Sequence, residues 1–243
     1  MAEALPWLLL AAVAFAASTL ASVTGFGGAV LLLPFVVAVY GVRDAVPVLT
    51  VAQLLGNAGR VWVNRNDVSL PVVGWFALGA VPAALLGGAL FAAAPLPVLT
   101  RVLGLFLVLA AAVWHFRERA FPRLTRRGFA PLGAASSFVS ALVGSSGPLV
   151  APFFVAHGLV KGAYVGTEAL AAVVTHAAKL AAYWHAALLT PETLAGGLPL
   201  GLVMVAGAYA GKRVMARLPE RAFLLLVQGT LVVVGLLFLI RGA

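Results

Sequence analysis

The chain has 243 residues, of which 63% are hydrophobic and only 9% are charged, and its mean hydropathy is +1.09. A soluble domain carries about 25% charged residues, so this composition excludes a soluble protein. The net charge of +9 would point to a nucleic-acid partner in a soluble protein. Here most Lys and Arg residues lie in short loops between apolar segments, where they indicate membrane topology, and no nucleic-acid partner is expected. The absence of Cys excludes disulfides and thiolate metal sites.

The apolar residues form continuous runs rather than alternating, which favours transmembrane helices over a β-barrel. The first run has Glu3 and no Lys or Arg ahead of it, so we interpret it as a retained helix rather than a signal peptide. Five segments are predicted in the first half, at about residues 6–23, 28–40, 45–63, 71–93 and 97–116, with a turn at 41–44. Five more are predicted in the second half, at about residues 129–142, 147–157, 162–189, 194–215 and 221–240.

A glycine-rich break follows the first segment of each half. Residues 24–29 read TGFGGA, and residues 143–148 read VGSSGP. When the two halves are aligned so that Pro34 matches Pro152, Gly27 and Gly28 match Ser145 and Ser146. Further landmarks recur in the same order, namely Gly41 with Gly158, Thr50 with Thr167, Gly87 with Gly211, and Pro95 with Pro219. The small residues could serve only close helix packing. However, helix breaks at matching places in two halves are a typical sign of a transporter's binding site.

The sequence therefore predicts an all-α integral membrane protein with discontinuous or re-entrant helices at 25–28 and 144–147. We expect a first transmembrane repeat at 1–116, a basic cytoplasmic loop at 117–128 and a second repeat at 129–243. Placing the five arginines of that loop inside puts most other basic residues inside too, in agreement with the positive-inside rule. These residues are Arg65, Lys161, Lys212, Arg213, Arg217 and Arg221. Both termini then lie outside, and the two repeats are inverted relative to each other.

Two segments carry polar residues on one helix face. The third segment has Thr50, Gln53, Asn57 and Arg60, and the eighth has Glu168, Thr175 and Lys179 with His176 beside them. A charged side chain at the bilayer centre costs roughly 2.5 to 3.5 kcal/mol, so such residues usually face the bundle interior or a cavity. For Arg60, which lies near the inner end of its segment, snorkelling to the interface is the alternative.

A helix N-terminus offers unpaired N–H groups and partial positive charge, so two half-helices starting at the breaks could hold a small anion. Ser145 and Ser146 are good N-cap residues for the second half-helix. The expected substrate-binding residues are Gly25, Gly27, Gly28, Gln53, Asn57, Arg60, Ser145, Ser146, Gly147, Thr175, His176 and Lys179.

Glu168 is the only acid deep in an apolar segment, which is too few carboxylates for a metal-cation site, and no metal or cofactor is expected. An intramembrane carboxyl that changes its charge is a natural proton carrier, so we assign Glu168 to proton coupling. The alternative is a fixed charge partner for Arg60 or Lys179.

The glycine break at 25–28 with Pro34, its echo at 144–152 and the two-repeat layout resemble the sulfite exporter TauE/SafE family, also called the 4-toluene sulfonate uptake permease family. The resemblance extends over essentially the whole chain. It implies a multi-pass carrier of the inner membrane for small sulfur-containing anions such as sulfite, sulfonates or sulfoacetate, coupled to protons. The chain departs from the family's three glycines, since it has Ala29 in the first copy and Ser145 and Ser146 in the second.

Two other functions fit parts of the sequence. One is a passive anion channel, which sequence does not separate from a carrier. The other is an intramembrane serine protease of the rhomboid type, because residues 144–147 read GSSG and His176 or His185 could activate Ser146. The first copy of the motif has glycines where the serines stand, which argues against the enzyme.

Overall fold

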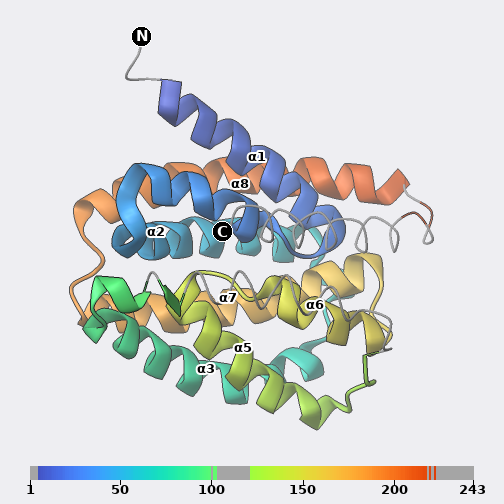
Figure 1. Cartoon of the computed structure of the whole chain (residues 1–243). Coiled ribbons are helices and arrows are strands. Elements are labelled where there is room, and N and C mark those ends of the chain that lie inside the picture. The colour runs from blue at the N-terminus through green and yellow to red at the C-terminus, as the bar shows by residue number, and fades with distance from the viewer. Residues whose placement is uncertain (1–4, 100, 103–120, 218, 220–221, 223–243) are drawn as a thin grey trace.

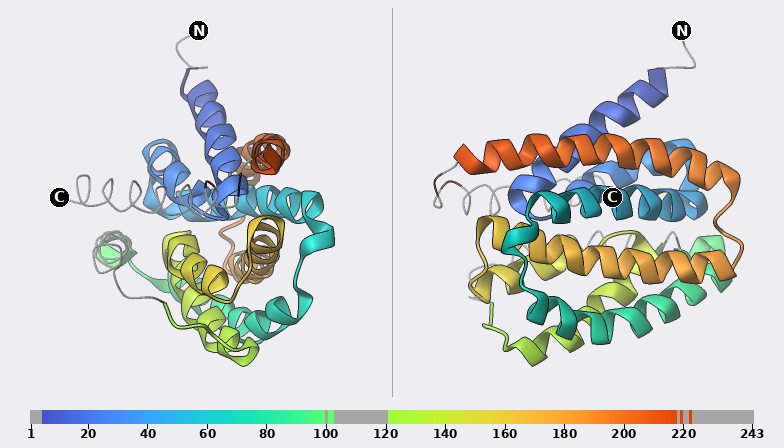
Figure 2. Two further views of the ribbon diagram at one scale, coloured as in Figure 1. Left: turned by 90° about the vertical axis from the view of Figure 1, so that its right-hand side faces the viewer. Right: turned by 180° about the vertical axis from the view of Figure 1, so that it is seen from behind.

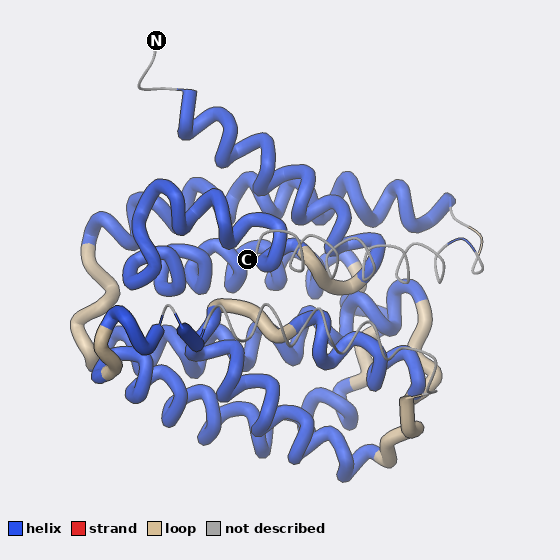
Figure 3. Tube along the Cα trace, in the orientation of Figure 1, coloured by secondary structure: helices blue, strands red, loops and turns tan. Residues whose placement is uncertain are grey.

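A computed structural model describes residues 5–99, 101–102, 121–217, 219 and 222. All regular secondary structure in these residues is helical, as predicted (Figure 3). The elements are α1 (Leu5–Thr24), α2 (Gly28–Val63), η1 (Arg65–Asp67), α3 (Leu70–Ala93), η2 (Arg126–Gly128), α5 (Phe129–Val143), α6 (Gly147–Ala156), α7 (Lys161–His185) and α8 (Pro191–Arg217). Most of the predicted fifth segment and nearly all of the tenth lie outside the described residues.

The helices form two layers (Figure 1). One layer holds α1, α2 and α8, and the other holds α3, α5, α6 and α7. The connection through η1 carries the chain from the first layer to the second (Figure 2). The polar helices α2 and α7 pack against each other where the layers meet. The residues that the sequence predicts to be functional therefore lie at the centre of the bundle.

Both glycine-rich breaks interrupt the helices where the sequence predicts. α1 ends at Thr24 and α2 begins at Gly28, while α5 ends at Val143 and α6 begins at Gly147. The chain folds back at each break. The rings of Trp7 and Tyr40 lie 5.9 Å apart, which joins the start of α1 to the far end of the next helical stretch. At the second break, the rings of Phe129 and His157 lie 5.1 Å apart and join the start of α5 to the end of α6. Each break is thus the tip of a helical hairpin.

The predicted turn at 41–44 is shorter than expected. Only Gly41 departs from helical geometry, with φ 74° and ψ 168°, and Arg43 and Asp44 are already helical. Glycine reaches positive φ without a Cβ clash, so one residue is enough to bend the chain between the two parts of α2. Arg43 ties this bend to the end of α3 by donating to the carbonyl oxygens of Ala92 and Ala94, at 2.8 and 3.3 Å.

Four described helices are long and apolar enough to cross a bilayer, namely Pro6–Thr24, Gly28–Val63, Leu70–Ala93 and Pro191–Arg217. Large apolar side chains such as Trp62, Leu78 and Leu202 are exposed on the outer surface of the bundle, where lipid can cover them. The chain is therefore a multi-pass, all-α membrane protein.

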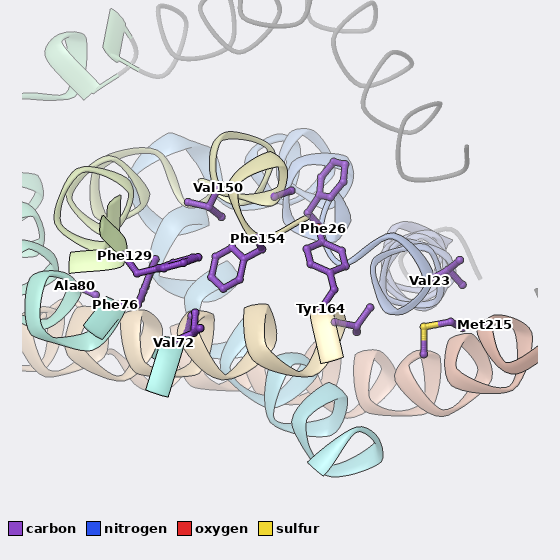
Figure 4. Close-up of a cluster of buried hydrophobic side chains, with 13 residues drawn as sticks. Val23, Phe26, Val72, Phe76, Ala80, Phe129, Val150, Phe154, Tyr164 and Met215 are labelled. Carbon is purple, nitrogen blue, oxygen red and sulfur yellow. The ribbon is translucent and has the colours of Figure 1, made fainter. Parts of the chain in front are cut away.

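A cluster of buried aromatic side chains holds the first break against the second layer (Figure 4). Phe26, between two break glycines, lies beside Tyr164 of α7. The ring of Phe154 in α6 lies 5.0 Å from that of Phe129 and 6.1 Å from that of Phe76. A Cβ added to Gly147 would come within 3.0 Å of the Phe26 Cβ, so the two breaks approach each other closely.

We predict that Gly25→Ala destabilises the protein by about 2–5 kcal/mol. Gly25 has φ +83°, which strains any L side chain, and its added Cβ would also overlap the buried ring of Tyr164. Thermal unfolding in detergent measures the effect. Gly41→Ala is the control for backbone strain, because Gly41 has φ +74° but no atom within 4 Å of the new Cβ, and this variant should lose only about 1–3 kcal/mol of stability. Equal losses in the two variants would contradict the assigned contact with Tyr164.

Candidate functional site

The two breaks have the same backbone geometry. Gly25 and Gly144 have φ +83° and +88°, and their N–H groups donate to the carbonyl oxygens of Ala21 and Ser140, at 2.8 and 2.9 Å. This left-handed glycine cap is a common helix ending. The matching positions are 119 residues apart, as are the helix starts at Gly28 and Gly147. The alignment through the prolines is therefore wrong by one residue, because Pro34 is the seventh residue of its helix and Pro152 only the sixth of its own.

Ser146 occupies the N-cap position of α6, but its side chain makes no capping hydrogen bond, contrary to expectation. An N-cap side chain normally accepts from the second or third N–H group of the helix. Pro148, the second residue, has no N–H, and the N–H of Leu149 donates to the Ser146 carbonyl at 2.9 Å. The helix thus makes no use of the Ser146 hydroxyl.

A cavity of about 50 Å³ lies between the two breaks. One water needs roughly 10–15 Å³ measured in the same way, so the cavity has room for a few waters or a small ion. One wall is apolar and includes Phe26, Phe76 and Phe154, and the rest is lined by the breaks and by polar residues of α2, α5 and α7. Most predicted site residues line it, namely Gly27, Gly28, Gln53, Asn57, Arg60, Ser145, Ser146, Gly147, Glu168, Thr175 and His176.

Two predicted residues do not line the cavity but contact residues at its edge. Gly25 presents its carbonyl to Arg60, and Lys179 reaches Ser140. Ser140 itself lines the cavity, and the sequence analysis missed it. Its signal was present, since Ser136, Ser137 and Ser140 are three polar residues in an otherwise apolar segment directly before a break.

Arg60 is held inside the bundle, so the snorkelling interpretation is wrong. It is 5% exposed, and its Nη1 donates to the carbonyls of Gly25 at 2.8 Å and Ala21 at 3.2 Å. The same atom lies 3.2 Å from Oε2 of Glu168, and Nη2 donates to Oδ1 of Asn57. The end of α1 leaves carbonyl groups unpaired and carries partial negative charge, which draws the guanidinium inward.

Lys179 has the corresponding position at the second break. It is fully buried, and its Nζ donates to Oγ of Ser140 at 3.4 Å. Lys179 follows Arg60 by 119 residues, and Ser140 follows Ala21 by the same number. Each break therefore has one buried cation at the end of the helix that precedes it. In the described part of the chain, Lys179 makes no ion pair with a carboxylate.

Two polar groups at the cavity have no hydrogen-bond partner among the described residues. Nε2 of Gln53 and Nδ1 of His176 are buried and make no hydrogen bond to a described residue. Thr175 differs, because its hydroxyl donates to the Ala171 carbonyl at 3.1 Å and accepts from Ser137 at 2.8 Å. Buried polar groups are normally paired, so the free amide and imidazole nitrogens point to a ligand or water in the cavity.

The protease interpretation finds little geometric support. Ser146 and His176 both line the cavity, yet no hydrogen bond joins them among the described residues. His185 is exposed, and its Nδ1 contacts the Ala181 carbonyl of its own helix at 2.8 Å. A nucleophilic serine needs a base within hydrogen-bond reach.

Comparison with known proteins assigns the chain to a family. The family model described as "Sulfite exporter TauE/SafE" matches residues 10–238, which include both breaks and the whole cavity. No curated protein and no solved structure matches the chain. A match over nearly the full length, together with the apolar helices, shows that the chain belongs to the sulfite exporter TauE/SafE family of membrane transporters.

Proposed function

We propose that the protein is a secondary transporter that carries a small sulfur-containing anion, of the sulfite, sulfonate or sulfoacetate class, across the inner membrane. The observation that carries this proposal is the cavity between the two helix breaks. α2 and α6 both begin at its wall, so their first N–H groups and the positive ends of their dipoles are directed toward it. Such helix starts favour anions.

The charge balance around the cavity also supports an anion. Two buried cations lie near the cavity: Arg60 lines it, and Lys179 contacts the lining residue Ser140. Among the described residues, Glu168 is the acid that lines it. With His176 neutral, the net charge of these groups is positive. A cation would meet repulsion here as well as too few oxygen ligands.

Reciprocal contacts support two inverted repeats, at 1–116 and 129–243, joined by the loop 117–128. A Cβ at Gly87 of α3 would meet the Phe138 carbonyl and Ala141 of α5, and one at Gly211 of α8 would meet the Thr19 carbonyl and Ser22 of α1. The contacted pairs again differ by 119 residues. Figure 1 shows α1 and α8 running toward one end of the bundle and α3 and α5 toward the other. Inverted repeats around a central site allow alternating access.

The anion site can be tested by titration calorimetry of the purified protein with sulfite and with sulfoacetate. Asn57→Leu removes the amide between Arg60 and Gln53, and Ser146→Val removes a hydroxyl that the helix does not use. We expect each variant to raise the Kd for the anion about tenfold or more, since a hydrogen bond to a charged group contributes about 1.5–3 kcal/mol. Unchanged anion binding in both variants, or binding of a cation instead, would contradict the assigned site.

Glu168 remains our candidate for proton coupling. It lies against Arg60 of α2, and Tyr164, His176 and Lys179 are the other titratable groups on its own helix near the cavity. A carboxylate at the wall repels an anion in the same cavity, and protonation removes that repulsion. Anion and proton would thus favour each other's binding, which couples their movement. The ion pair with Arg60 also fits the alternative role, a fixed structural partner.

Glu168→Gln separates the two roles. The amide keeps the size of the side chain but stays neutral, so we expect anion binding to remain while a proton gradient no longer drives accumulation. Flux of sulfite into proteoliposomes, measured with and without a proton gradient, tests this. Proton-driven flux equal to that of the native protein would rule out the coupling role. If sulfite flux through the native protein is the same with and without a proton gradient, transport is not proton-driven, and a passive channel is favoured.

The proposed orientation has both termini outside and the basic loops inside. The segments predicted inside do gather at one end of the bundle. Lys212 of α8 donates to Oδ1 of Asn64 at 2.6 Å and lies 3.8 Å from Asp67, and His157 contacts the Leu124 carbonyl at 2.8 Å. Arg123, Arg126 and Arg127 lie in the described part of the basic loop, while Arg117 and Arg119 lie outside the described residues.

Because the chain has no Cys, single cysteines report this topology directly. Asn66 lies in η1 and Glu192 in the first turn of α8, at opposite ends of the bundle, and both are exposed. In intact cells, a membrane-impermeant maleimide should label Glu192→Cys and should label Asn66→Cys only after the membrane is opened. The reverse pattern would invert the proposed orientation.

A further inference from the structure

We propose that the two buried cations act on the anion through neutral relays, which end at Nε2 of Gln53 and at the hydroxyl of Ser140. This inference deepens the proposed function and rests on it. It adds Ser140 to the binding site, makes Gln53 a principal donor, and assigns Arg60 and Lys179 as positioning residues.

The first relay runs along one face of α2. Arg60 donates from Nη2 to Oδ1 of Asn57, which fixes the orientation of that amide. Nδ2 of Asn57 must then face Gln53, and it donates to Oε1 at 3.4 Å. The Gln53 amide is fixed in turn, with Nε2 as its free end. This nitrogen is buried, has no hydrogen-bond partner among the described residues, and belongs to a side chain that lines the cavity. Its two N–H groups therefore have no acceptor among the described residues, and we assign them to the ligand.

The second relay is shorter. Lys179 has only donors, so Oγ of Ser140 accepts in their 3.4 Å contact. The hydroxyl proton of Ser140 is then left to donate. Buried helical hydroxyls commonly donate to a carbonyl four residues earlier, as Thr50 does to Val46 at 2.7 Å and Thr175 to Ala171. For the Ser140 hydroxyl, the hydrogen bonds of the described residues include only the one from Lys179, and Ser140 lines the cavity.

The relays resolve a conflict between charge and reversibility. In a medium of low dielectric constant, a direct contact between an anion and an unscreened cation is strong, and removing either partner leaves a costly buried charge. A transporter must release its substrate on the other side. Hydrogen bonds in a chain polarise one another, so a cation at the start strengthens the donor at the end without contacting the ligand. The anion then leaves from neutral groups, and Arg60 and Lys179 keep their partners at α1 and α5.

Calorimetric titration with sulfite tests the relays, using Gln53→Met, Ser140→Ala, Lys179→Met and the double variant Ser140→Ala/Lys179→Met. Gln53→Met and Ser140→Ala should each raise the Kd at least tenfold, because each removes a donor to the anion. Lys179→Met should raise it as well, and the double variant should bind within about twofold of the weaker single variant, since both changes interrupt the same relay.

Ser136→Ala is the matched control. Ser136 lies one turn before Ser140 on α5, is equally buried, and contacts its own helix at the Gly133 carbonyl. It does not line the cavity, and sulfite binding should be unchanged. Ser140→Thr keeps the hydroxyl and should restore binding. The unfolding midpoint without anion, measured for every variant, detects a change that acts only through the fold.

The outcomes are separable. If the native protein binds sulfite and both Gln53→Met and Ser140→Ala bind it equally well, the relays are overturned while the proposed function stands. If the losses from Ser140→Ala and Lys179→Met multiply in the double variant, Lys179 acts on the anion directly and the second relay is overturned. If the native protein binds neither sulfite nor sulfoacetate, the proposed function fails, and this inference fails with it.

Discussion

The requirement that a membrane protein pair its backbone polar groups internally governs this structure. Each break ends one helix and begins another inside the bundle, and each ending leaves carbonyl groups without partners. At the first break Arg60 donates to the Gly25 carbonyl, and it gives the Ala21 carbonyl, which already accepts from the Gly25 N–H, a second donor. The glycine cap, the cation and the helix dipole thus form one unit. Substituting the glycine would disturb the position of the cation, and removing the cation would take the Arg60 donor away from the Gly25 carbonyl.

The same constraint places the site between the breaks. Carbonyl groups at the end of α1 contact Arg60, while the first residues of α2 and α6 line the cavity. The negative end of α1 and the positive end of α2 are therefore separated by only a few residues, and in our proposal the anion binds beside the positive end. The aromatic cluster around Phe26 and Tyr164 holds this arrangement, because it anchors the first break against the second layer.

Most of the fold could be predicted because its signals are local. Long apolar runs, glycine breaks and polar residues at helical spacing located the described helices and every polar side chain of the cavity lining except Ser140. Contacts between distant segments could not be predicted in this way. Nothing local indicates that Ala21, Glu168 and Asn57 would meet at Arg60, or that Lys179 would reach Ser140. The alignment by prolines also failed by one residue, since a proline tolerated at two adjacent positions of a helix is a weaker marker than a glycine with positive φ.

The two halves share a backbone plan but differ in chemistry. At the first break the cation contacts backbone carbonyls and the carboxylate of Glu168, whereas at the second Lys179 contacts a hydroxyl. Where the first half has Ala21, the second has Ser140, and no carboxylate pairs with Lys179 among the described residues. A matched backbone allows the site to open to either side with similar geometry. We propose that Glu168, which pairs with Arg60, makes the first break sensitive to protonation. In our proposal, the symmetry of the helices therefore allows the site to open to each side of the membrane. The difference in side chains between the two breaks couples anion transport to protons.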